Sequence, residues 1–459
     1  MGTARVPGWV WAVLVGAHLL GLGWALSKGH WDFPDSGRYV QAAENLRVHG
    51  QLYARPWPKA APHGQVVQEL TIRPVGYPLV IWALGATGRI PVALLVVQNL
   101  LSLLNLGLVL RFWVWMARPN PRDWVWAVAG ILTFPAQLIY SSTVMSETML
   151  QTAVLVMAGA GLLFIKTHSK RALAGVAGAV VLALLLKPVF YPLAMAIAGV
   201  GIVLAVRQRR LLLGLIGLGP LVIVGLYMGW NARRTGYFHF SSITEINLLQ
   251  YNAAGVMRQV AGPAAEERWV DAVLQAANAQ PDFSARQQVI RARASAVLWA
   301  HPVVYARQQV QGMAALVLDP GRFDISQFLG LAPPSGGGFL AQVRAGTMWQ
   351  AVGRLPLALL GWLGVVLLAN ATRLVLAWRG FRRLRNREPM LRYGRWIAVA
   401  LVFYIAVLTG PLGAARFLVP VWPLLLALAL AGLRAGKTPL ASETTQGCGL
   451  LNVLLGRIE

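Results

Sequence analysis

Acidic residues are scarce in this chain, and several of them gather just after its first apolar segment. Only 16 of the 459 residues are Asp or Glu. The polar stretch 31–78 contains four of these acids and, near its end, a basic residue: Asp32, Asp35, Glu44, Glu69 and Arg73. A carboxylate can take a proton from a hydroxyl group, and a cation can neutralise an anionic leaving group. We therefore look for chemistry first in this stretch.

The composition is that of a membrane protein. Hydrophobic residues make up 57% of the chain and charged residues 12%, against roughly 25% charged residues in a soluble domain. Apolar runs of about 17 to 25 residues recur along most of the sequence, and each is long enough to cross a bilayer as a helix. We therefore predict an all-α polytopic membrane protein. No small-x-small cleavage site follows the first run, residues 6–26, which favours a retained span over a cleaved signal peptide.

The net charge of +25 does not indicate a nucleic-acid partner. Lys and Arg fall in short clusters between the apolar runs, as expected for the cytoplasmic loops of a membrane protein. The single cysteine, Cys448, leaves no partner for a disulfide within the chain and excludes a cysteine-based metal site.

About ten spans are expected, with the N-terminus in the cytoplasm and the loop 27–73 outside. The predicted spans are 8–26, 91–116, 124–140, 148–165, 172–186, 193–206, 211–229, 354–377, 396–410 and 418–433. The apolar stretch from Pro74 to Ala86 is too short to cross comfortably, so it is predicted to be re-entrant or interfacial. If it crossed, the basic clusters at 166–171 and 207–210 would both face outward.

The chain is expected to have four segments. In order, these are an N-terminal transmembrane module with the first outer loop (1–229), an outer and partly amphipathic region (230–350), C-terminal transmembrane helices (351–433) and a cytoplasmic tail (434–459). Helical spacing of apolar residues over 265–318 predicts amphipathic helices that lie against the membrane or pack on the spans.

This topology collects ionisable residues from distant parts of the chain at the outer mouths of the spans. They are Asp32, Asp35, Arg73, Glu147, Lys187, His301 and Arg416. Basic residues on the outer face run against the positive-inside tendency, so they require their own explanation. A bound anion, such as a phosphate at the level of the lipid headgroups, would provide one.

Several motifs resemble those of one enzyme class. The pattern D-S-G-R-Y-V-Q-A-A-E-N-L followed by T-I-R-P-V-G-Y-P resembles the first outer loop of GT-C glycosyltransferases. The most similar branch contains the protein O-mannosyltransferases and the bacterial lipid A aminoarabinose transferases. Three further motifs agree in order: S-S-T-V-M-S-E-T with Glu147, the Lys187-Pro188 pair, and A-R-F-L-V-P-V-W-P with Arg416. H-P-V-V-Y, with His301, resembles a feature often found in the juxtamembrane region of these enzymes. The resemblance covers residues 30 to 430 approximately.

The resemblance implies transfer of a sugar from a polyprenyl-phosphate donor to an acceptor on the non-cytoplasmic side. The acceptor would be a glycolipid, a glycan or a protein, and membrane lipid would surround the site. The implied location is the bacterial inner membrane, with the active site on the periplasmic side. The chain departs from the protein mannosyltransferases in having Asp35-Ser36 where they have an Asp-Glu pair, and it shows no large C-terminal soluble domain.

Two carboxylates are the candidates for catalysis. Asp35 would be the base that removes the proton of the acceptor hydroxyl; its alternative role is an N-cap for the helix that follows. Glu147 would bind a metal or orient the acceptor; its alternative role is an acid stabilised by the macrodipole at a helix N-terminus. A divalent metal, Mg²⁺ or Mn²⁺, would find oxygen ligands in Asp35 and Glu147, and the sequence leaves open whether one is used.

Three cations are the candidates for binding the donor phosphate: Arg73, Lys187 and Arg416. Cations placed in advance in a site shielded from water neutralise the charge of the leaving group as the bond breaks. The alternative for Arg73 is a side chain that snorkels to the headgroups.

A second set of residues could contact the substrate: Asp32, Tyr39, Tyr77, Tyr191 and His301. Asp32 could equally be a turn residue, and His301 an interfacial histidine. The tyrosine rings could stack on a sugar, but Tyr and Trp also populate the interfacial belts of membrane proteins.

The alternative function is that of a membrane transporter or lipid flippase without transferase activity. Transporters place ionisable residues near the middle of the bilayer, often on broken helices. The predicted spans are nearly free of charge in their interiors, and the acids lie at span mouths, which favours an enzyme.

Overall fold

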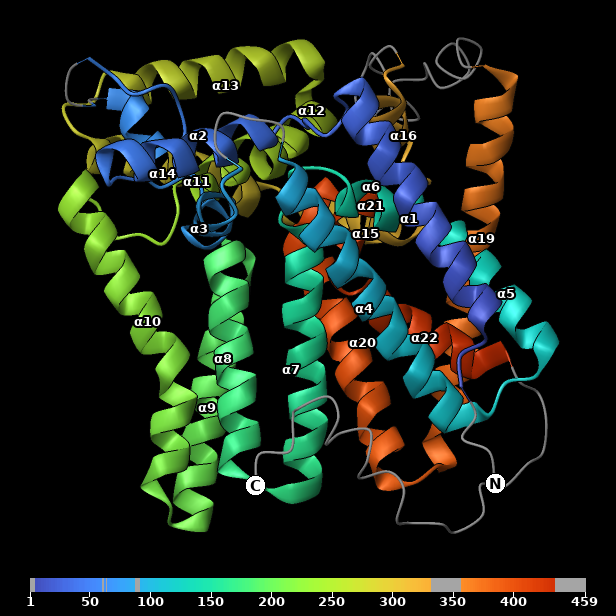
Figure 1. Ribbon diagram of the computed structural model, residues 1–459. Coiled ribbons are helices and arrows are strands. Elements are labelled where there is room, and N and C mark those ends of the chain that lie inside the picture. Colours follow the sequence, from blue (N-terminus) through green and yellow to red (C-terminus); the bar gives the residue numbers. More distant parts are fainter. Residues whose placement is uncertain (1–4, 60–61, 63, 87–90, 332–355, 434–459) are drawn as a thin grey trace.

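The chain is described here from a computed structural model, which covers residues 5–59, 62, 64–86, 91–331 and 356–433 (Figure 1). The predicted cytoplasmic tail, with Cys448, lies outside these residues, and so does the end of the predicted outer region. Every regular element in the described part is helical. The predicted all-α class is therefore confirmed.

Seven helical units in the described part are long and apolar enough to cross a membrane. They are α1 (Gly8–Lys28), α4 (Val92–Ala117), α7 (Glu147–Thr167), η2 with α9 (Pro188–Gln208), α10 (Leu211–Thr235), α19 with η4 (Leu357–Asn386) and α20 with η5 (Pro389–Leu412). An eighth is obtained if α5 (Pro121–Leu132) and α6 (Pro135–Ser141), which meet at an angle of 59°, are counted as one span. The polytopic architecture is thus confirmed.

Two of the predicted spans fall on shorter helices. The predicted span 172–186 lies in α8 (Lys170–Leu186), which has 17 residues, and the span 418–433 contains α22 (Trp422–Leu433), which has 12. The stretch from Pro74 to Ala86 contains only the eight-residue helix α3 (Gly76–Ala83). A helix of eight residues is about 12 Å long, too short to cross a bilayer.

The remaining helices lie mainly at one end of the spans. In Figure 1, α2, α12, α13 and α14 form a polar layer, here called the cap, above the long apolar helices. The bounds are α2 (Ser36–His49), η1 (Gly64–Leu70), α11 (Ile243–Asn247), the π-helical η3 (Leu248–Ala253), α12 (Ala254–Ala261), α13 (Pro263–Asn278), α14 (Phe283–Ala300), α15 (Pro302–Leu318), α16 (Arg322–Leu329) and α21 (Ala415–Leu418). Residues 265–318 are thus almost entirely helical, as predicted.

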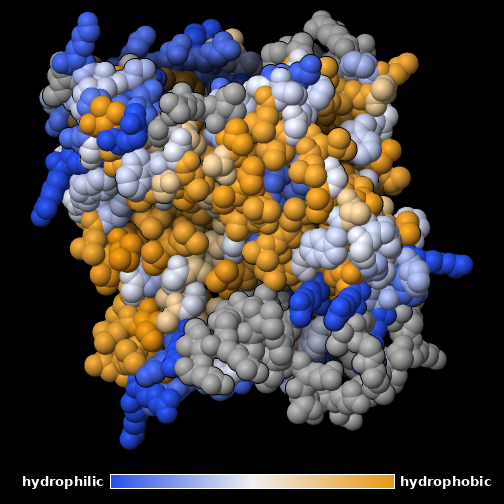
Figure 2. Space-filling view, viewed as in Figure 1, coloured by the Kyte–Doolittle hydropathy of each residue, from blue (hydrophilic) through white to orange (hydrophobic). Residues whose placement is uncertain are grey.

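The surface separates into an apolar belt between two polar ends. Figure 2 shows hydrophobic residues over the middle of the molecule and hydrophilic residues above and below them. The turns that follow α7, α9 and α19 lie at the end opposite the cap (Figure 1). These turns carry the basic clusters, including Lys166 and Lys170, Arg209 and Arg210, and Arg385. All three basic turns therefore lie on the same side of the apolar belt, as the predicted topology requires.

One buried cation is an exception in the span interiors, which were predicted to be nearly free of charge. Arg373 of α19 is only 4% exposed. Its guanidinium donates to the Thr133 carbonyl (2.5 Å) at the break between α5 and α6, and it lies 4.8 Å from the ring centroid of Trp422. Because Pro135 prevents a continuous helix there, backbone carbonyls lose their helical partners. Arg373 provides a donor at this break, so its contacts are those of a structural residue.

Candidate active site

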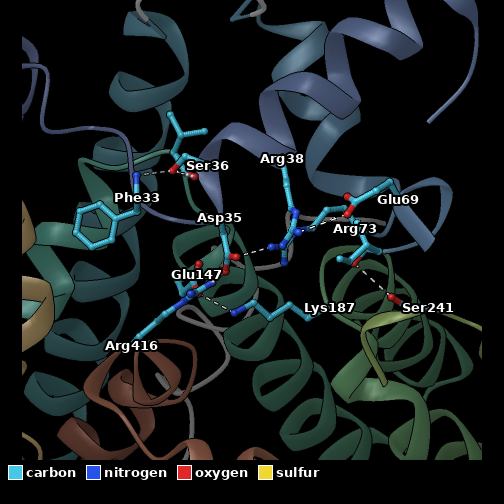
Figure 3. Close-up of polar contacts among 12 residues, drawn as sticks. Phe33, Asp35, Ser36, Arg38, Glu69, Arg73, Glu147, Lys187, Ser241 and Arg416 are labelled. Atoms are coloured by element: carbon cyan, nitrogen blue, oxygen red, sulfur yellow. Dashed lines mark hydrogen bonds and ion pairs between the residues drawn. The ribbon is translucent and has the colours of Figure 1, made fainter. Parts of the chain in front are cut away.

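The segments that precede α2 and α7 are joined by hydrogen bonds. The backbone N–H of Val144 donates to the Trp31 carbonyl (2.9 Å), and the Ser36 hydroxyl donates to the Val144 carbonyl (2.9 Å). Ser36 also accepts from the backbone N–H of Phe33 (2.9 Å). These contacts bring the N-terminus of α2 to the N-terminus of α7, and with them Asp35 and Glu147 (Figure 3).

Five ionisable side chains meet at this junction and are here called the ion cluster: Asp35, Arg73, Glu147, Lys187 and Arg416. Arg416 joins the two acids, because its Nη2 lies 2.8 Å from Asp35 Oδ2 and its Nε lies 2.5 Å from Glu147 Oε1. Arg73 pairs with the other oxygen of Asp35, and Lys187 Nζ lies 2.7 Å from Glu147 Oε1. All five residues predicted for catalysis and phosphate binding therefore lie together (Figure 3).

The two acids differ in their access to solvent. The Asp35 side chain is 25% exposed, the largest fraction in the ion cluster, whereas Glu147 is fully buried. Three cations face two carboxylates, so the cluster carries one surplus positive charge when all five groups are ionised. A buried surplus charge is costly unless a counter-ion is bound. The arrangement therefore fits an anion that approaches from the side of Asp35.

The cations hold Asp35 in its ionised form. Burial by itself would raise the pKa of this carboxyl, but the charges of Arg416 and Arg73 outweigh burial and hold the pKa well below its usual range. Burial would likewise lower the pKa of the Arg416 guanidinium, but Glu147 and Asp35 raise it well above its ordinary value. Asp35 is consequently a carboxylate, able to accept a proton, at neutral pH.

Proline fixes the backbone beside two of the cations. Arg73 and Lys187 each precede a proline, which disfavours the helical conformation for the preceding residue. Lys187 accordingly has an extended backbone (φ −146°, ψ 134°) where α8 ends. Its ammonium and the Arg416 guanidinium lie 5.3 Å and 5.5 Å from the ring centroid of Phe417. An aromatic ring thus supports two of the three cations.

Two tyrosines predicted to stack on a sugar do not have the exposure that this requires. Tyr39 is 2% exposed and Tyr77 is fully buried. The Arg73 guanidinium lies 4.8 Å from the Tyr39 ring centroid, the two tyrosine rings pack edge to face at 4.8 Å, and the Tyr77 hydroxyl donates to Gln98 Oε1 (2.6 Å). Both rings are packed in the core next to Arg73. The prediction that they stack on a sugar is therefore corrected.

Three other predicted substrate contacts are not among the residues that form the ion cluster. Asp32 is exposed, Tyr191 begins α9, and His301 lies between α14 and α15. Within the described residues, no hydrogen bond or ion pair joins any of them to the cluster. Asp35, in turn, makes no side-chain hydrogen bond as the N-cap of α2. The capping alternative for Asp35 is therefore wrong.

The two carboxylates do not fit a divalent metal. Both oxygens of Asp35 are paired with guanidinium groups, and one oxygen of Glu147 accepts from both Lys187 and Arg416. Among the described residues, no group of three or more His, Cys, Asp or Glu side chains could hold a metal ion. A metal at this point would also lie beside three cations, which would repel it.

The sequence interpretation assigned no role to a second set of ionisable residues beside the cluster. Buried Glu69 accepts from the guanidinium groups of Arg38 (3.4 Å) and Arg55 (3.2 Å). On another side, the Tyr140 hydroxyl donates to Asp324 Oδ1 (2.7 Å), and both residues are buried. The only sequence signal for Asp324 is the scarcity of acids, since Asp319 and Asp324 lie five residues apart in a chain with few carboxylates.

No protein-family model and no curated protein matches the chain. Two solved structures are similar to it. One is ArnT from Cupriavidus metallidurans bound to undecaprenyl phosphate, with 16% identity over 92% of this chain and 76% of that chain and a TM-score of 0.36. The other is the arabinosyltransferase EmbB from Mycobacterium smegmatis, with 15% identity over 98% of this chain and 44% of that chain and a TM-score of 0.34.

Both of these proteins are GT-C glycosyltransferases, the class that the sequence motifs resemble. With TM-scores below 0.5, the likenesses say nothing about the donor, the acceptor or the catalytic residues of this chain.

Proposed function

We propose that this chain is a membrane glycosyltransferase that moves a sugar from a polyprenyl-phosphate donor to an acceptor hydroxyl, with Asp35 as the base. The observation that carries the proposal is the ion cluster itself. It combines a surplus positive charge with one partly exposed carboxylate at the end of a bundle of apolar helices. A lipid phosphate would match both the charge and the apolar surroundings.

The cations would stabilise the leaving group. When the bond between the sugar and the phosphate breaks, negative charge develops on the phosphate oxygens. Arg73, Lys187 and Arg416 are held in place before the reaction by their ion pairs and ring contacts. Cations that do not need to reorganise are the most effective at stabilising such charge.

Binding of the phosphate would also prepare Asp35 for its task. In the ion cluster, the charges of Arg416 and Arg73 make Asp35 a weak proton acceptor, because they outweigh burial and hold its pKa low. A phosphate that draws these guanidinium groups toward itself would weaken that effect and raise the pKa of Asp35. The carboxylate would then become a better base only when the donor is present.

Glu147 is proposed to hold the cations rather than to touch the substrate. It is fully buried, and a single oxygen accepts from both Lys187 and Arg416. Its carboxylate therefore fixes the distance between two phosphate-binding groups. This role differs from the metal binding or acceptor orientation predicted from the sequence.

The proposed side of the membrane follows from the basic turns. These lie at the end opposite the cap (Figure 1), and basic turns are enriched on the cytoplasmic side of membrane proteins. The ion cluster would then lie on the outer face, which is the periplasmic side if the membrane is a bacterial inner membrane. The acceptor would be a glycolipid, a glycan or a protein that reaches this face.

The direct test is an assay of the purified protein in sealed lipid vesicles with polyprenyl-phosphate sugars and extracted envelope glycolipids, glycans and proteins as acceptors. Wild type is expected to transfer the sugar, and Asp35→Asn to lower kcat by about 10²- to 10⁴-fold, the usual contribution of a positioned base. Asp282→Asn is the control, because Asp282 only caps α14 and Asn can keep that contact. Unchanged transfer by Asp35→Asn would refute the base, and movement of the lipid across the bilayer without loss of its sugar would favour a flippase.

A further inference from the structure

The segment that carries Arg416 has little structure of its own. It follows η5 (Gly410–Leu412) and contains α21, a helix of only four residues. A single helical turn is not stable in isolation, because too few hydrogen bonds offset the cost of ordering the chain. The place of the Arg416 side chain must therefore be set by neighbouring elements.

Helix α15 lies directly against this segment. A Cβ atom added at Gly312 would collide with the Gly410 carbonyl, and one added at Gly413 would collide with the Gly312 carbonyl. The two backbones thus touch without intervening side chains. Glycine is required at such a close approach, so α15 forms a fitted support for the segment.

The end of α15 adds a directed contact next to Arg416. Asp319 follows the last residue of α15, and its Oδ2 accepts from the backbone N–H of Ala415 (3.0 Å). Its Oδ1 accepts from the backbone N–H of Gly321 (3.0 Å). The Asp319 carbonyl in turn accepts from the side-chain amide of Asn370 in α19 (3.1 Å). Asp319 is therefore anchored to a long helix and holds the residue that immediately precedes Arg416.

We propose that Asp319 is a positioning residue that fixes Arg416 in the bridge between Asp35 and Glu147. The role of Arg416 in phosphate binding rests on the function proposed above. The placement of its side chain by Asp319 does not. No catalytic role is assigned to Asp319, because its two carboxylate oxygens are both used by backbone N–H groups.

The contact demands a carboxylate. Both partners of Asp319 are donors, and a carboxylate accepts with both oxygens, whereas an asparagine accepts with only one and presents an NH₂ group at the other position. Gly321 is two residues away, so Asn at 319 can keep this local turn with its oxygen. Its NH₂ group would then face the N–H of Ala415. Asp319→Asn thus breaks the long-range contact selectively.

The same hydrogen bond can be removed from its other end. Ala415 is the first residue of α21, and Ala414 before it is extended (φ −145°, ψ 153°). Proline is tolerated at the first position of a helix, and it favours an extended residue before it. Ala415→Pro therefore deletes the donor, and because its ring occupies the place of the N–H, the Asp319 carboxylate must turn away from residue 415. The two variants change opposite ends of one hydrogen bond. If one of them fails to fold, the other still tests whether this hydrogen bond positions Arg416.

The test is a double-mutant cycle with Arg416→Met, in which undecaprenyl phosphate binding and the thermal unfolding midpoint are both measured. A hydrogen bond to a charged group contributes enough for Asp319→Asn or Ala415→Pro to weaken binding by about 10- to 100-fold. In the Arg416→Met background, the same substitutions are expected to change binding by less than about twofold. In the unfolding midpoints too, the effect of Asp319→Asn or Ala415→Pro is expected not to add to that of Arg416→Met.

Asp282→Asn is the matched control, since it is the same isosteric change at an aspartate that caps α14 by accepting from the Ala285 N–H and does not contact α21. Its effect on the unfolding midpoint is expected to add to that of Arg416→Met. Full additivity of Asp319→Asn or Ala415→Pro with Arg416→Met would overturn the positioning role. If wild type failed to bind undecaprenyl phosphate, the proposed function would fall, and the unfolding cycle would still decide the role of Asp319.

Discussion

The buried cation Arg373 and the partly exposed cations of the ion cluster are stabilised in different ways. Arg373 lies among the long helices, where its guanidinium contacts the Thr133 carbonyl, the Asn370 side chain and the Trp422 ring. Among the described residues, no carboxylate pairs with it. The cations of the ion cluster instead surround two carboxylates, and their side chains are partly exposed.

This difference separates a structural cation from cations suited to bind a ligand. Arg373 is enclosed, and its donors are directed mainly at oxygens of a broken helix, so a ligand has no path to it. The ion cluster has a surplus of positive charge, and its partners are charged groups that a phosphate could replace. Burial of a cation within an apolar helix is therefore no sign of function by itself; exchangeable partners and access are better indicators.

Among the substitutions that test this comparison, Glu147→Gln is expected to lower the free energy of unfolding most. Gln keeps the shape of the side chain but removes the charge that holds Lys187 and Arg416. Removing one partner of a buried ion pair costs about 3–5 kcal/mol, because the other partner stays buried without compensation. Thermal or denaturant unfolding of the protein in detergent measures this loss. An unfolding free energy within about 1 kcal/mol of wild type would show that Glu147 does not anchor the cations.

A smaller loss of stability, and almost none of activity, is expected from Arg373→Met. The substitution removes the donor to the Thr133 carbonyl, and an unsatisfied buried acceptor costs about 1–3 kcal/mol. Because Arg373 is not part of the ion cluster, kcat for sugar transfer is expected to stay within about twofold of wild type. The same unfolding and transfer assays apply. A large loss of kcat at unchanged stability would contradict the structural assignment.

A third prediction concerns the pH dependence of stability. Burial, reinforced by Asp319, raises the pKa of Asp324 from its ordinary value of 3.8 to about 7, although the hydrogen bond from Tyr140 opposes the shift. Between these two values the unfolded chain ionises Asp324 and the folded chain does not, so this group makes the protein less stable as the pH rises from about 4 to 7.

Asp35 acts in the opposite sense and at lower pH. The charges of Arg416 and Arg73 outweigh burial and lower its pKa, so its contribution to stability is present above pH 3.8 and is lost as the pH falls below that value. Asp35 therefore contributes little change to unfolding midpoints measured from pH 4 to 7. Burial also raises the pKa of Asp319, so the difference between wild type and Asp324→Asn is what isolates Asp324. Asp324→Asn is expected to flatten the decline in this window, and an unchanged slope would contradict the raised pKa.

The sequence predicted the ion cluster because each of its members has a local signal. Asp35, Arg73, Glu147, Lys187 and Arg416 all lie where an apolar run begins or ends, four of them next to proline or in a glycine- and proline-rich segment. Charge at such places is rare enough to be noticed. The parity of the spans then assigned all five to one side of the membrane.

The sequence could not predict features that depend on which side chains face each other in the folded protein. Tyr39 and Tyr77 were predicted to contact a sugar, but the packing of α2 on α3 places both rings in the core. The bond from Asp319 to Ala415 joins residues 96 positions apart and leaves no local pattern. The role of Arg373 was not predicted, because it donates to a carbonyl at the break between α5 and α6. In the sequence these two helices form one continuous apolar segment.

The central claim is that the cations of the ion cluster bind a lipid phosphate, which replaces Asp35 as the partner of the Arg73 and Arg416 guanidinium groups. The most direct measurement is the affinity of undecaprenyl phosphate for wild type and for Asp35→Asn, by calorimetry or native mass spectrometry at neutral pH. Because Asn at 35 releases Arg73 and Arg416 from a competing charge, the account predicts that the variant binds the lipid phosphate at least as tightly as wild type while it fails to transfer sugar. Binding weakened by more than about tenfold in a folded Asp35→Asn protein would contradict it.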